Sequence, residues 1–312
     1  MASDAAINIR KQVIDHPQFS VIKERLLDAL DATKASGVGK GFTILGPSGV
    51  GKSTLIQSFS SPLTAQEESR FVKRVILVDV PASPSKKSIA SAILAGMQDP
   101  FAFSVRHSAE EKLARIVKLT RELKTQVLIL DEGQHLSKRN HTNQYETADW
   151  LKNLLNATHI LIVLAGLPSL EQFINVNEQL RRRFSSAYRL EPFTLNDPKS
   201  KLNFLGVLQS FQATLDVKAI KLTSPDAAKR MYFASCGLID YVVMLLEKGS
   251  YIARQENTDI HLGILSRAFR EEVWSSAPPD RNPFEMEFDM RPLTFSGEPF
   301  DGYKWGSTHE TA

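Results

Sequence analysis

The stretch that most constrains the fold is residues 41–59, which read GFTILGPSGVGKSTLIQSF. The apolar run from Phe42 to Leu45 predicts a short buried strand, and residues 53–59 are typical of a helix. The glycines between them allow backbone conformations that other residues rarely adopt, so the chain can turn sharply from strand to helix. This succession of strand, tight loop and helix predicts a layered α/β domain.

Three more near-continuous apolar runs predict strands at residues 74–80, 125–132 and 159–166, and a shorter strand is expected at 188–190. Apolar residues recur with helical spacing in the segments around them, at residues 19–32, 88–98, 111–124 and 149–156. Strands that are apolar on both faces and alternate with helices are typical of a parallel sheet. The first part of the chain is therefore predicted to be an α/β domain with a parallel sheet.

The character of the sequence changes after Pro192. Residues 197–274 contain no strand pattern, and helices are predicted at 201–211, 225–236, 239–253 and 262–272. From residue 275 onward, prolines and aromatic residues occur without periodicity, which predicts an extended tail. We therefore expect an N-terminal helical segment, an α/β domain, a small all-helical domain and a tail, at residues 1–40, 41–192, 193–274 and 275–312.

The composition of the 312 residues, 42% apolar and 23% charged, is that of a globular protein with a full core. The sequence has no run of about 18 apolar residues and no signal-peptide features, so we expect a cytoplasmic protein without a membrane span. The only cysteine, Cys236, lies in a predicted helix and is expected to be a buried structural thiol. The histidines are scattered, so no transition-metal site is expected.

The net charge of +3 conceals an asymmetry along the chain. Residues 277–312 hold three basic and seven acidic residues, a net charge of −4, so the remainder carries +7. A basic body permits contact with nucleic acid, although an excess of lysines is also common on an ordinary solvated surface.

The loop after the first strand matches the P-loop pattern, with four residues between Gly46 and Gly51 and with Lys52-Ser53 following. Such a loop wraps its backbone N–H groups around phosphates, the lysine reaches the β and γ phosphates, and the serine ligates Mg²⁺. The sequence therefore predicts binding of ATP with Mg²⁺. The residues expected to bind the nucleotide are Gly46, Pro47, Ser48, Gly49, Val50, Gly51, Lys52, Ser53, Thr54 and Asp131.

The pair Asp131-Glu132 ends the apolar run VLILDE. With Ser53, Asp131 is expected to hold Mg²⁺, and Glu132 is placed to polarise an attacking water. A carboxylate next to the Mg²⁺ aspartate favours hydrolysis of ATP over transfer to a small-molecule acceptor. Two acidic residues after an apolar strand can also be without function, but the P-loop upstream favours the catalytic interpretation.

The basic run LRRRF at residues 180–184 follows the fourth predicted strand. An arginine at this position commonly reaches the γ-phosphate bound by a neighbouring subunit. Arg183 is the first candidate for this catalytic arginine and Arg182 the second, and the alternative is a solvated basic turn.

The P-loop, the DE pair, the apolar fourth strand, the RRRF turn and the helical domain resemble, in this order, an AAA+ ATPase. The more particular stretches are His16-Pro17 before a helix, ILGPSGVGKST, LILDEGQHL, VLAGLPSLEQFI and LRRRF followed by LEPF. Over roughly residues 12–270 the chain resembles the TniB/TnsC family of transposition ATPases, which are related to the phage Mu target-selection ATPase.

This resemblance implies a DNA-binding ATPase that forms homo-oligomeric rings or helical filaments on duplex DNA. It also implies two protein partners, the transposase and a target-selecting factor, which in some members is a TniQ-type protein of a CRISPR-associated transposon. By position, it makes Lys52, Ser53, Asp131 and Glu132 the phosphate, Mg²⁺ and hydrolysis residues.

The sequence departs from the wider AAA+ pattern at two places. The fourth strand ends in Leu164, Ala165 and Gly166, where a polar sensor residue is common, and the helical domain has no arginine at residues 236–240, where Asp240 stands instead. Both departures favour slow ATP hydrolysis that acts as an assembly switch.

Pore-facing basic loops are expected to grip DNA phosphates without reading bases. The candidates are Lys86 and Lys87 in the loop after the second strand, and Lys138 and Arg139 after the DE pair; either loop can instead be solvated surface. The acidic tail is expected to dock onto a partner, the alternative being that its aromatic residues pack on their own domain. The candidate anchors are Phe284, Phe288, Phe295, Phe300 and Trp305.

The preferred function is thus an ATP-dependent, DNA-binding regulator of transposition. Two alternatives stay open: a secretion- or replication-type AAA+ ATPase with the same core, and a P-loop kinase for a small metabolite. The first alternative would carry a peptidoglycan-binding or winged-helix appendage, and the second would need an acceptor site within one subunit.

Overall fold

A computed structural model describes residues 9, 14, 16–67, 69, 71–138 and 141–302, without the side chain of His141. The chain divides into two compact units. The first, here the α/β unit, consists of Gln18–Ser48 and Lys52–Glu191; the second, the helical unit, consists of Met1–Pro17, Gly49–Gly51 and Pro192–Ala312.

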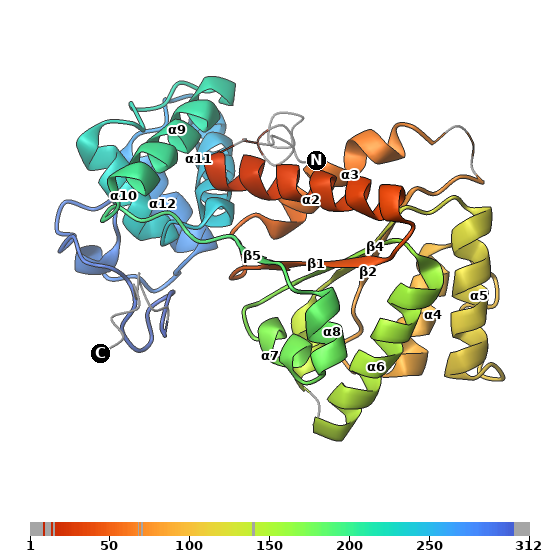
Figure 1. Cartoon of the computed structure of the whole chain (residues 1–312). Coiled ribbons are helices and arrows are strands. Elements are labelled where there is room, and N and C mark those ends of the chain that lie inside the picture. Colours follow the sequence, from red (N-terminus) through yellow and green to blue (C-terminus); the bar gives the residue numbers. More distant parts are fainter. Residues whose placement is uncertain are drawn as a thin grey trace. The chain divides into compact units, whose positions relative to one another are not determined.

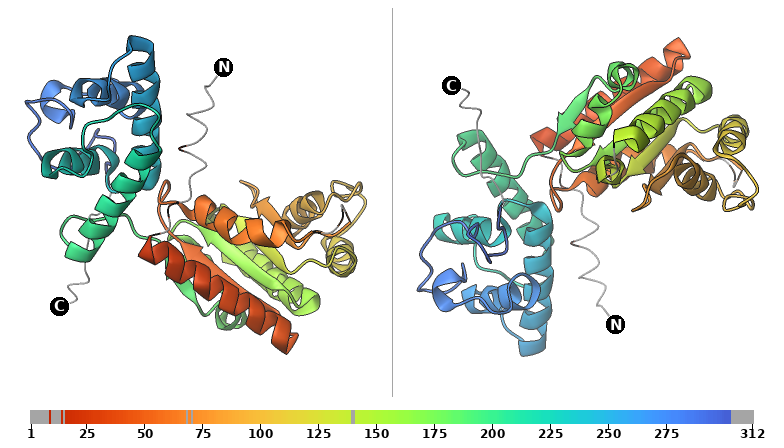
Figure 2. Two further views of the ribbon diagram at one scale, coloured as in Figure 1. Left: turned by 90° about the horizontal axis from the view of Figure 1, so that it is seen from above. Right: turned by 90° about the horizontal axis from the view of Figure 1, so that it is seen from below.

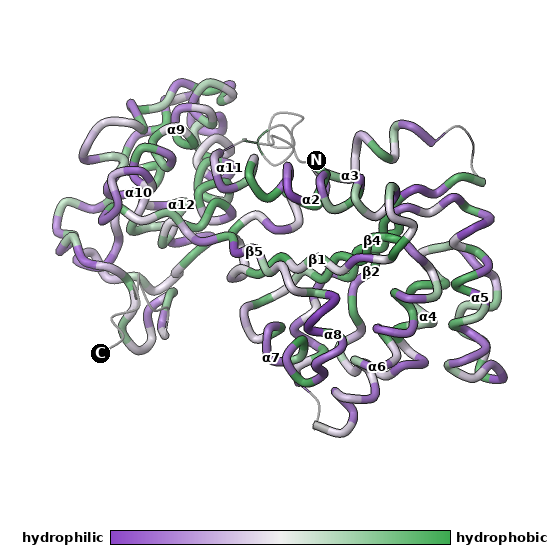
Figure 3. The backbone as a smooth tube through the Cα atoms, viewed as in Figure 1, coloured by the Kyte–Doolittle hydropathy of each residue, from purple (hydrophilic) through white to green (hydrophobic). Residues whose placement is uncertain are grey.

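The α/β unit is built on a five-stranded sheet in the order β2-β3-β4-β1-β5, and all its strand pairs are parallel. β4 is largely hydrophobic along its length, and β1 becomes hydrophobic toward its end at Leu45 (Figure 3). The predicted parallel sheet is confirmed. The strands are β1 (Lys40–Leu45), β2 (Val75–Asp79), β3 (Val127–Asp131), β4 (Leu161–Gly166) and β5 (Ala187–Arg189).

The register of the sheet brings the functional segments to one edge. Leu45 at the end of β1 pairs with Gly166 at the end of β4, and Asp79 at the end of β2 pairs with Asp131 at the end of β3. Because parallel strands present their carboxyl ends at the same edge, the P-loop and the DE pair emerge next to each other.

Helices cover both faces of this sheet. α2 and α3 lie over one face, and α4, α6, α7 and α8 lie over the other (Figure 1). The views from above and below show the two layers separately (Figure 2). The helices of this unit are α2 (Pro17–Ser36), α3 (Lys52–Thr64), α4 (Lys86–Gly96), α5 (Ala109–Glu122), α6 (His141–Thr158), α7 (Leu170–Asn175) and α8 (Glu178–Arg183).

The helices begin where the sequence supplies capping residues. Ser85 and Ser88 form a capping box at the start of α4, and Ser108 and Glu111 form one at the start of α5. The Asn177 side chain accepts hydrogen bonds from two backbone N–H groups at the start of α8.

Four local features differ from the expectations. α6 begins at His141 rather than at residue 149, because its polar first half lacks the apolar spacing that marks a helix in sequence. The short helix α7 was not expected. The basic run predicted as a turn forms the helix α8, which is too short for its periodicity to be recognised in the sequence. The segment after the DE pair forms a 3-10 helix, η1 (Gly133–Lys138).

The helical unit contains α9 (Pro198–Thr214), α10 (Pro225–Ser235), α11 (Ile239–Glu256) and α12 (Leu262–Glu272), followed by a 3-10 turn, η2 (Pro279–Arg281). α9 and α10 each begin with an N-cap side chain followed by proline, Asp197-Pro198 and Ser224-Pro225. Cys236 is buried, as predicted, and burial raises the pKa of its thiol to about 12. Within the described residues, no helix is both long and apolar enough to cross a membrane.

The tail after residue 275 is irregular, but most of its expected anchors are not available to a partner. Phe284, Phe288 and Phe300 are buried within the helical unit, where their rings contact Phe269, Phe233 and Tyr241 respectively. The expectation of partner docking is therefore wrong for these three residues, because they complete the core of their own unit. Phe295 is 62% exposed, and Trp305 lies outside the described residues.

A buried guanidinium fixes the tail against itself. Arg281, only 6% exposed, pairs with Asp289 and with Glu298, whose Oε1 is 2.8 Å away, and donates to the Pro292 carbonyl. Arg291 also donates to Glu298, at 2.7 Å. Because a buried charge is costly unless it is paired, these contacts hold residues 281–298 in one conformation.

We expect Glu298→Gln to lower the free energy of unfolding of the helical unit at pH 7 by on the order of 1–3 kcal/mol, because it removes a buried charged partner of Arg281. Burial opposes ionisation of Glu298, but hydrogen bonds from Arg291, Phe295 and Arg281 outweigh it and hold the pKa below its ordinary value of 4.5. The stabilisation is therefore complete above about pH 4.5 and is lost as the pH falls through the lowered pKa of the folded state.

Urea unfolding of both proteins between pH 7 and pH 3 measures this difference. Glu287→Gln, which removes an exposed carboxylate from the same tail, is the matched control. A wild-type advantage that persists unchanged at pH 3, or an equal loss in the control, would contradict the assignment.

Candidate nucleotide-binding site

The P-loop joins β1 to α3 through two glycines with positive φ, Gly49 at 77° and Gly51 at 102°. Other residues rarely adopt these angles, so the loop needs glycine at both positions. α3 begins immediately afterwards, at Lys52, and its free N-terminal N–H groups favour an anion at this end.

Lys52 folds back over the loop that precedes it. Its Nζ donates to the carbonyl oxygens of Gly46 and Pro47, each at 2.8 Å. Burial lowers the pKa of this ammonium, while Asp131 and Glu132 act in the opposite direction. A partly desolvated cation whose partners are neutral carbonyls fits a phosphate group as its ligand.

Asp131 lies opposite Ser53 at the end of β3. The Ser53 hydroxyl is 3.3 Å from Asp131 Oδ2, although the two residues are 78 positions apart. Asp131 is only 9% exposed, and burial raises the pKa of its carboxyl group, with the hydrogen bond from the Glu132 N–H acting against this. A buried carboxylate beside a hydroxyl supplies the oxygen ligands that Mg²⁺ prefers, so these residues fit a nucleotide phosphate with its Mg²⁺.

Glu132 has a strained backbone at this edge of the sheet. Its φ is 56°, in the left-handed region that non-glycine residues seldom occupy. Its N–H donates to Asp131 Oδ1 at 2.8 Å, and its exposed carboxylate accepts a hydrogen bond from Gln134 Nε2. The acidic group is thus open to water while its backbone is fixed.

Gln134 belongs to this site, and its contacts were not predicted from the sequence. Its side chain is buried, and its Oε1 accepts a hydrogen bond from the Leu167 N–H at 3.1 Å, just beyond the end of β4. The available signal was a polar residue inside the stretch LILDEGQHL, two positions after Glu132. Its partner at Leu167 could not be identified from spacing.

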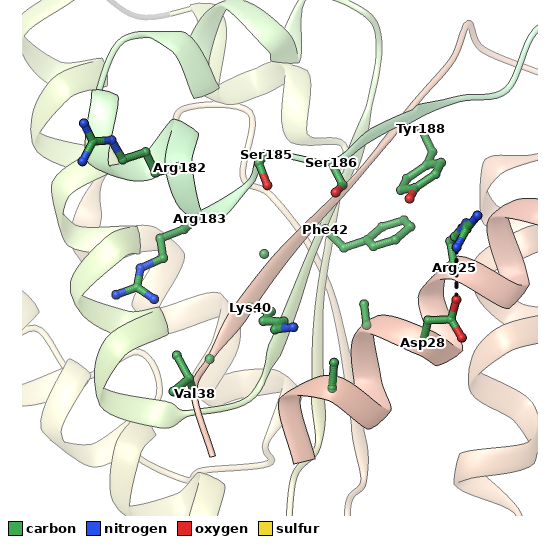
Figure 4. Close-up of a pocket in the computed structure, with 14 residues that line it drawn as sticks. Arg25, Asp28, Val38, Lys40, Phe42, Arg182, Arg183, Ser185, Ser186 and Tyr188 are labelled. Atoms are coloured by element: carbon green, nitrogen blue, oxygen red, sulfur yellow. Dashed lines mark hydrogen bonds and ion pairs between the residues drawn. The ribbon is translucent and has the colours of Figure 1, made fainter. Parts of the chain in front are cut away.

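The candidate arginines lie at the end of α8 and line a pocket of about 480 Å³. Arg182 and Arg183 extend on one side of the pocket, and Arg25 and Asp28 of α2 lie on the other (Figure 4). Lys40 from the start of β1 adds a further cation, so the charged residues of the lining are four basic side chains and one acidic side chain, Asp28.

The two arginines differ in their partners. Arg182 pairs with Glu178 one helical turn earlier, at 2.6 Å. Within the described part of the chain, no hydrogen bond or ion pair reaches the exposed guanidinium of Arg183. Arg183 therefore stays the first candidate for an arginine that acts on another molecule.

The basic residues proposed to contact DNA are distributed differently from the prediction. Lys86 and Lys87 lie in the first turn of α4 rather than in a loop, because the Ser85 cap starts the helix there. Lys86 pairs with Glu146 at 3.1 Å, and Lys87 donates to the Val105 carbonyl at 2.8 Å. Lys138 is exposed at the end of η1, and Arg139 lies outside the described residues.

The chain matches one protein family in sequence and is similar to several solved structures in fold. The family model described as Bacterial TniB protein matches residues 6–194. No curated protein matches the sequence.

Solved structures are similar to the chain at low sequence identity. The ORC1 protein of Aeropyrum pernix, solved in complex with DNA, aligns with a TM-score of 0.63 and 17% identity over 86% of this chain and 69% of that one. The ORC2 protein of the same organism aligns with a TM-score of 0.61 and 15% identity over 82% and 67%. Cdc6p of Pyrobaculum aerophilum aligns with a TM-score of 0.56 and 18% identity over 80% and 67%. These structures share the AAA+ fold, which the sequence predicted.

Asp131→Asn is expected to weaken the effect of Mg²⁺ on nucleotide binding, because it removes the buried charge beside Ser53. The ratio of ATP affinities with Mg²⁺ and with EDTA should fall by on the order of tenfold, while affinity in EDTA changes little. Titration of a fluorescent ATP analogue under both conditions measures this ratio. Asp79→Asn removes an exposed carboxylate from the end of the neighbouring strand and serves as the matched control. If the affinity ratio falls equally in both variants, the effect comes from the loss of any nearby negative charge and not from a Mg²⁺ ligand.

Proposed function

Because the chain belongs to the TniB family, we propose that it is an ATP-hydrolysing regulator of DNA transposition that assembles on duplex DNA. In this role it links a target-selecting factor to the transposase. The observation that carries the proposal is the meeting of Lys52, Ser53, Asp131 and Glu132 at the carboxyl edge of the sheet. The AAA+ fold supports the nucleotide chemistry, and the family supports its use in transposition.

Each side chain has a task that its geometry permits. Lys52 and the N–H groups of the P-loop would bind the phosphates, and Ser53 and Asp131 would hold Mg²⁺. When bound, Mg²⁺ neutralises charge on the phosphate oxygens. Glu132 would orient a water molecule and accept its proton, since its carboxylate is exposed while its backbone is fixed.

A metabolite kinase is a weaker interpretation of the same site. Such an enzyme needs an acceptor pocket and the cations that cover the transferred phosphate within one subunit. Here Arg182 and Arg183 stand beside a pocket formed by α2, β1 and the segment around β5, at the end of β1 opposite the P-loop. This placement suits an arginine that serves the nucleotide of a neighbouring copy, as expected for a homo-oligomer.

The grip on DNA would be electrostatic. Lys138 is exposed, whereas Lys86 and Lys87 would have to leave their present partners to reach phosphates. We therefore favour Lys138, with Arg139 beside it in the sequence, over the α4 lysines. The similar ORC1 structure contains DNA, which agrees with this use of the fold but does not distinguish transposition from a replication-type function.

Slow hydrolysis that serves as an assembly switch is part of the proposal. Leu164 and Ala165 at the end of β4 are fully buried, so this strand offers no polar side chain to the nucleotide. The partners would be the transposase and a TniQ-type factor, as in CRISPR-associated members of the family. Within the described tail, Phe295 is the candidate anchor that stays exposed.

Electron microscopy with duplex DNA tests the assembly. Rings or filaments should form with a slowly hydrolysed ATP analogue and DNA, and should be absent without nucleotide and in Lys52→Ala. Binding should also weaken steeply with salt, because phosphate contacts release counterions. Monomers under all conditions, or filaments that ignore Lys52, would overturn the proposal.

Mixing two inactive variants tests the role of Arg183. Glu132→Gln should bind ATP and assemble but not hydrolyse it, and Arg183→Ala should bind ATP but hydrolyse it on the order of 10³-fold more slowly. A mixture creates interfaces in which an intact arginine faces an intact nucleotide site, so part of the ATPase activity should return. Arg181→Ala, an exposed arginine of the same helix, is the matched control and should stay active. No recovery in the mixture would argue against an arginine shared between subunits.

A further inference from the structure

The side chain of Gln134 joins the candidate catalytic glutamate to the end of β4. Its Nε2 donates to Glu132, and its Oε1 accepts from the Leu167 N–H at 3.1 Å. We infer that Gln134 is a positioning residue. It holds the Glu132 carboxylate where this group can activate the attacking water molecule. This inference rests on the proposed ATP hydrolysis and adds a residue to which no role has been assigned.

The backbone around Glu132 shows why such a support is needed. A non-glycine residue in the left-handed region is unfavourable and persists only where its surroundings fix it. Asp131 Oδ1 accepts from the Glu132 N–H, and the Glu132 carbonyl accepts from the His135 N–H at 3.1 Å. The ring of His135 is in turn hydrogen-bonded to the Val80 carbonyl. These bonds fix the backbone, and Gln134 fixes the carboxylate.

An amide of this length can make both contacts. Glu132 presents an acceptor and Leu167 presents a donor, so the bridging group must donate at one end and accept at the other. A glutamate would keep the acceptor for Leu167 but lose the donor to Glu132. A methionine has a similar length and offers neither, and an asparagine is one methylene too short.

The structure leaves room for this bridge by placing glycine at two positions. A Cβ on Gly166 would lie 2.7 Å from Gln134 Oε1 and 2.9 Å from its backbone nitrogen. A Cβ on Gly133 would lie 2.9 Å from the Ala165 carbonyl oxygen. Any larger residue at Gly166 would therefore displace the glutamine.

Gln134 also explains how the site functions with an apolar end to β4. Leu164 and Ala165 are buried, and Gly166 has no side chain, so the strand itself supplies no polar group. The Gln134 amide reaches the end of β4 from η1, the 3-10 helix that follows β3. The end of β4 thus takes part in the site through the Leu167 N–H, which Gln134 links to Glu132.

The test compares Gln134→Met, Gln134→Glu and wild type with the full chain on duplex DNA. Both variants should lower kcat for ATP hydrolysis by on the order of 10- to 100-fold, because Glu132 loses its donor, while the Kd for the ATP analogue stays within about twofold. In a Glu132→Gln background, neither variant should lower kcat further. An unchanged kcat, an equal loss of nucleotide affinity, or additive losses with Glu132→Gln would each overturn the inference.

Amide hydrogen exchange at Leu167 supplies a readout that does not depend on activity. Gln134→Met should speed exchange at this N–H, whereas Gln134→Glu should leave it protected because the acceptor remains. Fast exchange in wild type would contradict the bridge itself. If wild type shows the protection but no ATP hydrolysis, the proposed function fails while the bridge stands, so the two failures can be distinguished.

Discussion

Two charged side chains held at one edge of a parallel sheet, Lys52 and Asp131, are the constraint on which the site depends. Each is partly removed from water, and burial shifts the pKa of each toward its neutral form. Such a pair is costly without ligands, and here the partners are loop carbonyls, a serine hydroxyl and a backbone N–H. The sheet places these groups together because the carboxyl ends of β1 and β3 lie at the same edge.

Glu132, next to Asp131, adds a group suited to catalysis to the groups at this edge of the sheet that are suited to binding. Glu132 is exposed but fixed in an unfavourable backbone conformation, and the contacts around it all come from segments at the ends of strands. Backbone strain clusters at functional sites, where it helps to preorganise a group. The bridge through Gln134 extends the arrangement to the end of β4, and the chain beyond it continues through α7 to α8, which carries Arg183.

Different interactions hold the tail of the helical unit in place. As far as residue 302, its irregular tail has no ladder of backbone hydrogen bonds, so aromatic burial and one buried guanidinium hold it in place. The acidic residues that give the tail its negative charge are in part the partners of Arg281 and Arg291. The negative charge of the tail, which suggested an external partner, is therefore neutralised in part within the helical unit.

The parallel sheet, the P-loop and the acidic pair Asp131-Glu132 could be predicted from the sequence, because continuous apolar runs, glycine spacing and acidic residues at a strand end are local signals. The sequence also indicated the buried state of Cys236. Tertiary structure alone decided that Gln134 meets Leu167, that Phe284, Phe288 and Phe300 are buried, and that Lys86 and Lys87 have partners. Those contacts join segments far apart in the chain or depend on where a helix begins, and neither periodicity nor composition encodes which distant groups will meet.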